Sequence, residues 1–77
     1  MKVYCTNVDL LSCKSYNSKT YGTRTYGKVY ENGRLYDFCS DGVIEDVRNV
    51  DAVFNFKYGV KEGKVWTMLY LQEVKKN

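Results

Sequence analysis

The stretch that decides the fold is residues 23–39, which read TRTYGKVYENGRLYDFC. Its two halves are rich in Tyr, Val, Thr and Phe, residue types that suit a pleated and half-buried surface. The two halves flank Asn32-Gly33, and an Asn-Gly pair between two such runs is the strongest short-range signal of a β-hairpin. The sequence therefore predicts a strand over residues 23–30, a turn over 31–34 and a strand over 34–39.

Outward from this hairpin, hydrophobic periodicity predicts three further strands. Residues 2–13 alternate apolar and polar side chains with a phase slip near Asn7, which indicates a strand with a bulge or bend. Residues 14–22 contain Ser, Asn and Gly without core periodicity, and they predict a mobile loop. Residues 51–58 and 64–74 return to a period of two, and the turn that joins them is expected at 59–63.

Between the third and fourth strands, the pattern changes to a helical period. Val43, Val47 and Val50 follow the spacing i, i+4, i+7, and Ser40 or Asp41 can cap a helix. The sequence thus predicts a short helix within residues 41–50. Three strands, a helix and two strands is the order of an OB-fold barrel, and an SH3-like barrel is the main alternative. We expect a single mainly β domain over residues 1–77, a small five-stranded OB-like barrel with one short helix between strands three and four.

Composition argues against an enzyme, a metal site and a cofactor. The 77 residues include no histidine, which is the commonest general base and metal ligand at neutral pH. Three cysteines at positions 5, 13 and 39 are too few and too scattered for a zinc site, and reduced buried thiols fit better than a disulfide framework. The acidic residues between 37 and 51 match no calcium-loop spacing. We expect a non-enzymatic protein with no metal or cofactor.

Hydropathy and the N-terminal residues predict a cytoplasmic protein that does not enter a membrane. No apolar run approaches the roughly 18 residues that a transmembrane helix needs. The first residues, MKVYC, lack the charged-then-apolar pattern of a secretory signal. A cytoplasmic location is therefore expected whichever barrel the chain forms.

Charge is divided unevenly beneath a net charge of +3. Residues 1–36 carry six basic and two acidic side chains, whereas residues 37–56 carry one basic and five acidic side chains. Positive charge in the first half alternates with aromatic rings, a composition that suits a strand of phosphates and unstacked bases. The candidate nucleic-acid-binding residues are Lys19, Tyr21, Arg24, Tyr26, Lys28, Tyr30, Arg34, Tyr36 and Phe38.

Whether these side chains share one face depends on the register of the hairpin. A two-residue loop pairs Tyr30 with Leu35 and places the even-numbered residues of the two strands on opposite faces. A three-residue loop with Gly33 in a bulge pairs Tyr30 with Arg34 and unites the even-numbered residues. We favour the bulged register because it separates aromatic and basic side chains from aliphatic ones.

The bulged register predicts binding of single-stranded nucleic acid. We expect the ligand to be DNA rather than RNA. Bases stack on exposed rings for about 1–3 kcal/mol each, and phosphates need a positive track. Duplex DNA hides its base faces, and the only predicted helix is short and acidic. A purely structural role for these aromatic and basic residues is an equal alternative to nucleic-acid binding. Tyrosines often only cover the surface of a sheet, and the stems of lysine and arginine side chains lie over them. A protein-interaction module is the alternative function, since Tyr and Arg are also enriched at protein interfaces.

Three stretches of the sequence form a recognisable pattern: residues 18–22 (SKTYG), the hairpin ENGRLYDF at 31–38 and GKVW at 63–66. With these stretches, the chain resembles the small OB-fold single-stranded-DNA-binding proteins of bacteriophages and mobile elements. This resemblance implies a homodimer that coats single strands cooperatively. By this likeness, bases stack on Tyr21, Tyr26, Tyr36 and Phe38, and phosphates contact Lys19, Arg24, Lys28 and Arg34. The acidic residues 37–56 depart from the all-basic groove of that family.

Overall fold

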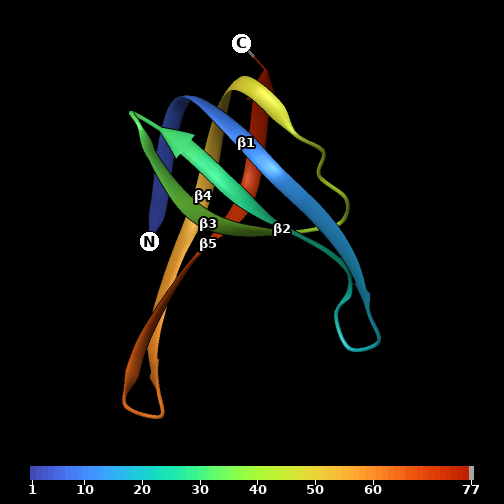
Figure 1. Cartoon of the computed structure of the whole chain (residues 1–77), viewed down its shortest axis with the longest axis vertical. Helices are drawn as coiled ribbons and strands as arrows, with labels where there is room; N and C mark the ends of the chain where they lie inside the picture. Colours follow the sequence, from blue (N-terminus) through green and yellow to red (C-terminus); the bar gives the residue numbers. More distant parts are fainter. Residues whose placement is uncertain (77) are drawn as a thin grey trace.

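Five strands close into one barrel in the computed structural model, which describes residues 1–76 (Figure 1). The order around the barrel is β1-β2-β3-β5-β4, and β4 pairs with β1 to complete it. The β3–β5 pair is parallel, and the other pairs are antiparallel. The strands are β1 (Lys2–Ser18), β2 (Gly22–Glu31), β3 (Arg34–Asp41), β4 (Val47–Lys61) and β5 (Lys64–Lys76).

The core is a single apolar cluster inside the barrel. Phe38 and Phe54 meet edge to face at its centre, with ring centroids 6.0 Å apart. Burying each such side chain stabilises the fold by about 1.5–3 kcal/mol. Leu69, Leu71 and Val74 of β5 pack against the cluster from one side. The fully buried members are Val8, Leu10, Val29, Phe38, Val50, Ala52 and Phe54.

Three β-bulges, each with a residue of positive φ, bend β1 and β4 so that these long strands can serve two sides of the barrel. Asn7, Ser12 and Asn49 each have a positive φ, and the β1 registers shift around Asn7 and Ser12. Each of these bulges leaves a backbone N–H group without a partner in the strand ladder. The carboxylate of an aspartate on the neighbouring strand or connection accepts a hydrogen bond from it. The N–H of Asn7 donates to Asp51 at 3.0 Å. The phase slip near Asn7 is confirmed as a bulge.

The helix expected within residues 41–50 is absent, so this part of the fold prediction is wrong. Residues 43–46 form an irregular connection, and β4 already begins at Val47. Val47 and Val50 pair with Leu10 and Val8 of β1. The extra residue of the bulge at Asn49 separates them by three positions. A bulged strand thus reproduces the spacing of one helical face.

The bulged hairpin register is also wrong. Glu31 pairs with Arg34 and Tyr30 pairs with Leu35, so the loop has two residues. Asn32 and Gly33 both have positive φ, 48° and 78°, as a type I′ turn requires. The even-numbered residues of β2 and β3 therefore lie on opposite sides of the sheet. This register decides which rings reach the surface.

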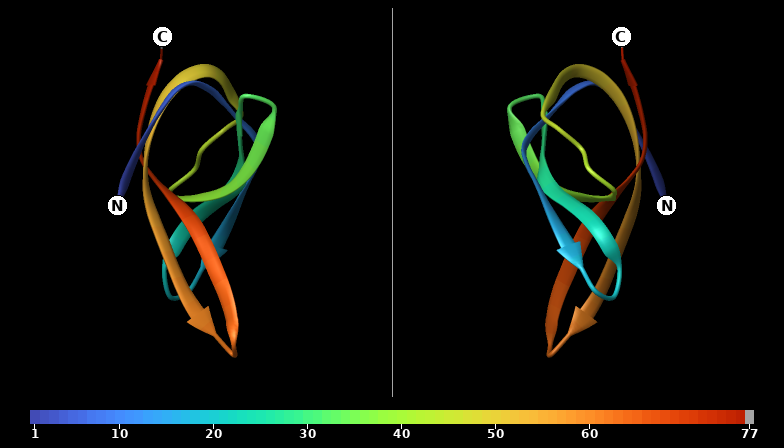
Figure 2. Two further views of the ribbon diagram at one scale, coloured as in Figure 1. Left: turned by 90° about the vertical axis from the view of Figure 1, so that its left-hand side faces the viewer. Right: turned by 90° about the vertical axis from the view of Figure 1, so that its right-hand side faces the viewer.

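The two ends of the barrel differ. Residues 42–46 close one end, where the hydroxyl of buried Thr25 donates to the Gly42 carbonyl at 2.8 Å and accepts the N–H of Ile44 at 3.0 Å. At the other side the β4–β5 hairpin projects well past the barrel (Figures 1 and 2). β1 also runs further than expected, to Ser18, so that only residues 19–21 form the predicted loop. Residues 1–76 contain no helix with the length and apolar character to cross a membrane.

Candidate nucleic-acid interface

The observed register divides the predicted residues between two surfaces. Arg24, Tyr26, Lys28 and Tyr30 point outward from β2, opposite in phase to buried Thr25 and Val29. The three candidates of β3, Arg34, Tyr36 and Phe38, belong to its inward phase instead.

Phe38 is a core residue and does not reach the surface. It is 0% exposed and contacts Phe54, so the expectation that it shares an exposed face with Tyr26 and Tyr30 is wrong. Tyr36, from the same phase, lines a cavity at the open end of the barrel rather than the outer surface of β2. Arg34 is exposed beside the type I′ turn. The cause of this difference is the two-residue turn. It points the even-numbered side chains of β3 into the barrel, whereas the expected three-residue loop would place them on the same side as Tyr26 and Tyr30.

Of the outward residues of β2, Arg24 and Tyr26 belong to a larger set, which we call the outer face: Tyr16, Tyr21, Arg24, Tyr26, Lys57, Trp66 and Tyr70. Lys28 and Tyr30 lie further along β2, outside this set. Across the strands, Tyr26 pairs with Cys39 of β3, and Cys39 pairs with Tyr70 of β5. Cys39 is only 1% exposed although it points outward, which is consistent with cover from the flanking rings. The outer face therefore extends over four neighbouring strands and continues onto β1 through Tyr16.

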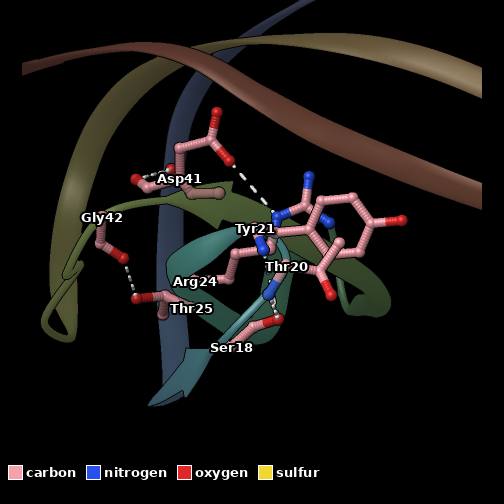
Figure 3. Close-up of polar contacts among 8 residues, drawn as sticks. Ser18, Thr20, Tyr21, Arg24, Thr25, Asp41 and Gly42 are labelled. Atoms are coloured by element: carbon pink, nitrogen blue, oxygen red, sulfur yellow. Dashed lines mark hydrogen bonds and ion pairs between the residues drawn. The ribbon is translucent and has the colours of Figure 1, made fainter.

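Arg24 lies at the centre of the outer face. Its guanidinium carbon is 5.1 Å from the Tyr21 ring centre and 5.9 Å from the Tyr70 ring centre, and the Tyr21 contact is visible in Figure 3. Lys57 approaches the same Tyr70 ring, with its Nζ 5.2 Å from the centroid. A cation over the face of an aromatic ring is attracted by the ring quadrupole, and each such contact is worth about 0.5–2 kcal/mol. These contacts hold the charged groups beside the rings. Cationic groups thus alternate with aromatic rings on the outer face.

The turn before β2 positions Tyr21 against Arg24. The hydroxyl of Ser18 accepts the N–H groups of Thr20 and Tyr21, each at 3.2 Å (Figure 3). This short side-chain-to-backbone turn fixes the backbone of the loop. The Tyr21 side chain is 69% exposed even though it contacts Arg24. Its ring is therefore held in place and remains accessible to a base. Lys19, in the same turn, is exposed as well.

Two basic residues of β2 are already paired with carboxylates of β3. Arg24 Nε lies 3.2 Å from Asp41 Oδ1, and Lys28 forms an ion pair with Asp37. The hydrogen bond to Asp41 raises the pKa of Arg24 above its ordinary value. Both carboxylates are well exposed, so the pairs are screened by solvent. A phosphate arriving at these cations competes with a carboxylate that is already there.

Trp66 extends the outer face along the β4–β5 hairpin. Its indole lies over Gly59 of β4, where a Cβ atom added to the glycine would come within 2.7 Å of Trp66 Cζ2. Glycine is needed there because the ring occupies the space of a side chain. Trp66 shares its phase on β5 with Tyr70, and 43% of it is exposed. The indole therefore presents one supported ring to solvent.

The residues of the outer face that sequence reasoning missed are Tyr16 of β1, Lys57 of β4, and Trp66 and Tyr70 of β5. Tyr16 lies in the first half of the chain, where basic and aromatic residues alternate, and Trp66 and Tyr70 share one phase of their strand. Nothing local signals that Tyr70 lies beside Cys39, because this parallel pairing joins residues about thirty positions apart. Lys57 reaches the face only through the same arrangement.

The thiols show no sign of activation. Burial raises the pKa values of Cys5, Cys13 and Cys39, for Cys13 to about 11. Thiols with raised pKa values are protonated at neutral pH and are poor nucleophiles. Within residues 1–76, no three side chains among His, Cys, Asp and Glu converge to hold a metal ion. The groups of the outer face that can interact with a ligand are therefore its aromatic rings and its cationic side chains.

Comparison with known proteins supports the fold. No family model and no curated protein sequence matches the chain. Among solved structures, a mitochondrial single-stranded-DNA-binding protein from S. cerevisiae matches with a TM-score of 0.69 and 10% sequence identity. The match covers 100% of this chain and 98% of that chain. The mitochondrial origin of this neighbour gives no particular support to a resemblance to phage proteins. At this identity the likeness concerns the fold, which is a five-stranded OB-like barrel.

Proposed function

We propose that the chain binds single-stranded nucleic acid, DNA in preference to RNA, without catalysing a reaction. The observation that carries the proposal is the placement of Arg24 between the rings of Tyr21 and Tyr70 on the outer surface of the barrel. Exposed bases stack on such rings, and the adjacent guanidinium and ammonium groups neutralise phosphates. The similar fold of a protein that binds single-stranded DNA also supports the proposal.

The outer face suits single strands better than duplexes. Stacking requires a base whose flat surface is free, and a duplex covers both surfaces of every internal base. In residues 1–76 there is no helix that could enter a major groove. The strands of an OB barrel instead present a curved surface around β2 and β3, where OB folds bind oligonucleotides.

The test is a fluorescence-anisotropy titration of a labelled oligothymidylate at low salt. Replacing Tyr70 by Ala removes a ring that contacts both Arg24 and Lys57. We expect the affinity to fall by about 5- to 150-fold, the equivalent of 1–3 kcal/mol of lost stacking. Tyr4→Ala is the matched control, because Tyr4 is an exposed tyrosine outside the outer face. No binding by the wild-type chain, or equal losses in the two variants, would reject the proposal.

The preference for DNA is tested in the same titration. An oligouridylate of equal length offers the same number of phosphates and similar pyrimidine rings. We expect it to bind more weakly than the oligothymidylate. Equal or tighter binding of the RNA would leave the single-strand proposal intact and overturn its DNA preference.

A further inference from the structure

β3 and β5 are paired over a short stretch only and separate before it. Their parallel pairing begins where Phe38 lies opposite Leu69. Ahead of this point, β3 starts at the turn beside β2, whereas β5 starts in the projecting β4–β5 hairpin, so the two strands diverge toward their starts (Figure 1). Among residues 1–76, the stretches 34–37 and 64–68 are therefore each paired on one side only.

Two residues on either side of this gap, Leu35 and Thr67, direct backbone hydrogen-bonding groups into it. Pairs in an antiparallel ladder alternate between hydrogen-bonded and non-hydrogen-bonded ones, and the pair that flanks a two-residue turn is hydrogen-bonded. Leu35 lies one position past the flanking pair of its hairpin, and Thr67 lies three positions past that of the β4–β5 hairpin. Both therefore turn their N–H and C=O groups away from β2 and β4. Unpaired strand edges of this kind are templates for an added strand.

The gap opens into a cavity of about 490 Å³ at the open end of the barrel, which we call the mouth. Its floor is largely apolar and includes Val3, Val29 and Phe56. Leu35 and Met68 belong to the outward phases of β3 and β5, and they line the mouth as well. The cavity therefore reaches through the gap to the outer surface. An occupant can contact both strand edges and the apolar floor at once.

The charged side chains that line the mouth are both acidic. They are Glu31 and Asp37, and within residues 1–76 the lining includes no lysine or arginine. Asp37 is paired with Lys28, whereas half-buried Glu31 belongs to none of the ion pairs found in residues 1–76, although Arg34 is its register partner. Burial and the nearby Glu31 carboxylate raise the pKa of the Cys5 thiol, which also lines the mouth. The mouth thus favours a cationic group beside an apolar one.

We propose that the mouth binds an extended segment of a partner protein, which inserts as a strand between β3 and β5 and carries basic side chains on either side of an apolar one. The free edges select a polypeptide backbone, because an added strand pairs with their N–H and C=O groups, and pockets for alternate side chains set the sequence preference. Side chains two positions apart lie on the same side of a strand, so the apolar and basic residues can face the mouth together. None of the residues of the outer face lines the mouth, so the proposal does not depend on nucleic-acid binding.

A synthetic peptide tests the binding. The probe is acetyl-Thr-Lys-Thr-Phe-Thr-Lys-Thr-amide, in which the phenylalanine and both lysines lie on one side of an extended strand whichever way it runs. We expect it to bind the full chain saturably, as measured by the amide chemical shifts of the chain. Glu31→Gln keeps the size of the side chain and removes its charge, so the dissociation constant should rise at least about tenfold. Glu45→Gln is the control, because Glu45 is an exposed acid in the connection at the closed end of the barrel. No saturable binding, or equal effects of the two substitutions, overturns the proposal.

Hydrogen exchange tests the insertion of a strand. In the free chain, the amides of Leu35 and Thr67 should exchange much faster than those of Tyr36 and Met68, which pair with β2 and β4. Saturation with the heptapeptide should slow exchange at Leu35 and Thr67 at least about tenfold. A heptapeptide that is N-methylated at alternate residues lacks the donors for one edge and should bind at least about tenfold more weakly. Slow exchange at both positions in the free chain, unchanged exchange in the complex, or equal binding of the N-methylated peptide overturns the proposal.

Failure of this proposal is distinguishable from failure of the proposed function. Tyr70→Ala removes a ring from the outer face, and it should bind the heptapeptide like the wild-type chain because Tyr70 does not line the mouth. If the wild-type chain binds the heptapeptide but no oligothymidylate, only the proposed function fails. If it binds the oligothymidylate but not the heptapeptide, only the proposal for the mouth fails.

Discussion

Replacing Asp37 and Asp41 together by Asn should strengthen binding of single-stranded DNA. The two carboxylates pair with Lys28 and Arg24, which are both predicted to contact phosphates. In the proposed complex, each phosphate at these two cations must compete with a resident carboxylate. The double substitution preserves the size of both side chains and removes two negative charges from the neighbourhood of the outer face.

The expected magnitude follows from the number of cations released. Each phosphate neutralised on a single strand contributes about −0.7 to the slope of log K against log salt, so two freed cations should steepen the slope by about 1.4. Exposed ion pairs are weak, so the gain in affinity at moderate salt should be only about two- to fivefold. With a slope difference of about 1.4, the advantage of the variant should shrink about sevenfold between roughly 50 and 200 mM salt.

The assay is the anisotropy titration repeated at four or more salt concentrations. Glu45→Gln serves as the control, because Glu45 is an exposed acid that takes no part in the Arg24–Asp41 or Lys28–Asp37 ion pair. It changes the net charge by one unit without freeing Arg24 or Lys28. If the double variant and Glu45→Gln give the same salt slope per charge removed, the paired carboxylates have no special role. A weaker-binding double variant would refute the reasoning outright.

Three further outcomes are expected. The backbone N–H of Cys13 donates a hydrogen bond to Asp46, which lowers the pKa of this carboxyl. The stabilising effect of Asp46 is therefore complete above its unfolded pKa near 4 and is lost as the pH falls through the lower folded pKa. Thermal melts below about pH 4 should show a smaller acid dependence of the melting temperature for Asp46→Asn than for the wild-type chain. Gly59→Ala forces the Trp66 indole off β4, which should shift its emission and weaken oligonucleotide binding while the melting temperature changes little. Phe38→Leu should lower the free energy of unfolding by about 1–2 kcal/mol and leave the affinity of the folded chain unchanged, since Phe38 is buried; selective loss of binding would show that its ring does reach the ligand.

Strand content and the position of the hairpin turn were predictable from local pattern. Alternating Tyr, Val and Thr on both sides of Asn32-Gly33 predicted β2, β3 and their turn, and the chain does fold so. The phase slip at Asn7 predicted a bulge. The turn type was not predictable in the same way, because Asn-Gly suits both the two-residue and the three-residue loop. The separation of aromatic and basic side chains from aliphatic ones favoured the three-residue loop, whereas the chain forms the two-residue loop.

The false helix has a specific physical cause. A β-bulge adds one residue between two inward positions, so Val47 and Val50 acquire the spacing of neighbours on one helical face. Asp46, which lies within the expected helix, serves a bulge instead, because its carboxylate accepts hydrogen bonds from the N–H groups of Ser12 and Cys13. Such pairings join residues more than thirty positions apart, and no single local window contains them.

The composition of the outer face depends on the closure of the barrel. Local pattern supplied Tyr21, Arg24 and Tyr26, which the structure places on that face. Tyr70 and Lys57 join them because β5 lies beside β3. The parallel pairing of two strands separated by β4 is a property of topology, and the sequence of either strand carries no mark of it.

The single tryptophan of the chain lies on the outer face and can report directly whether bases reach it. The measurement is the emission of Trp66 during titration with an unlabelled oligothymidylate and, separately, with a duplex of the same length. Stacking on the outer face predicts saturable quenching by the single strand and much weaker quenching by the duplex. Unchanged emission while anisotropy reports binding, or an equal response to the duplex, would contradict binding at this face.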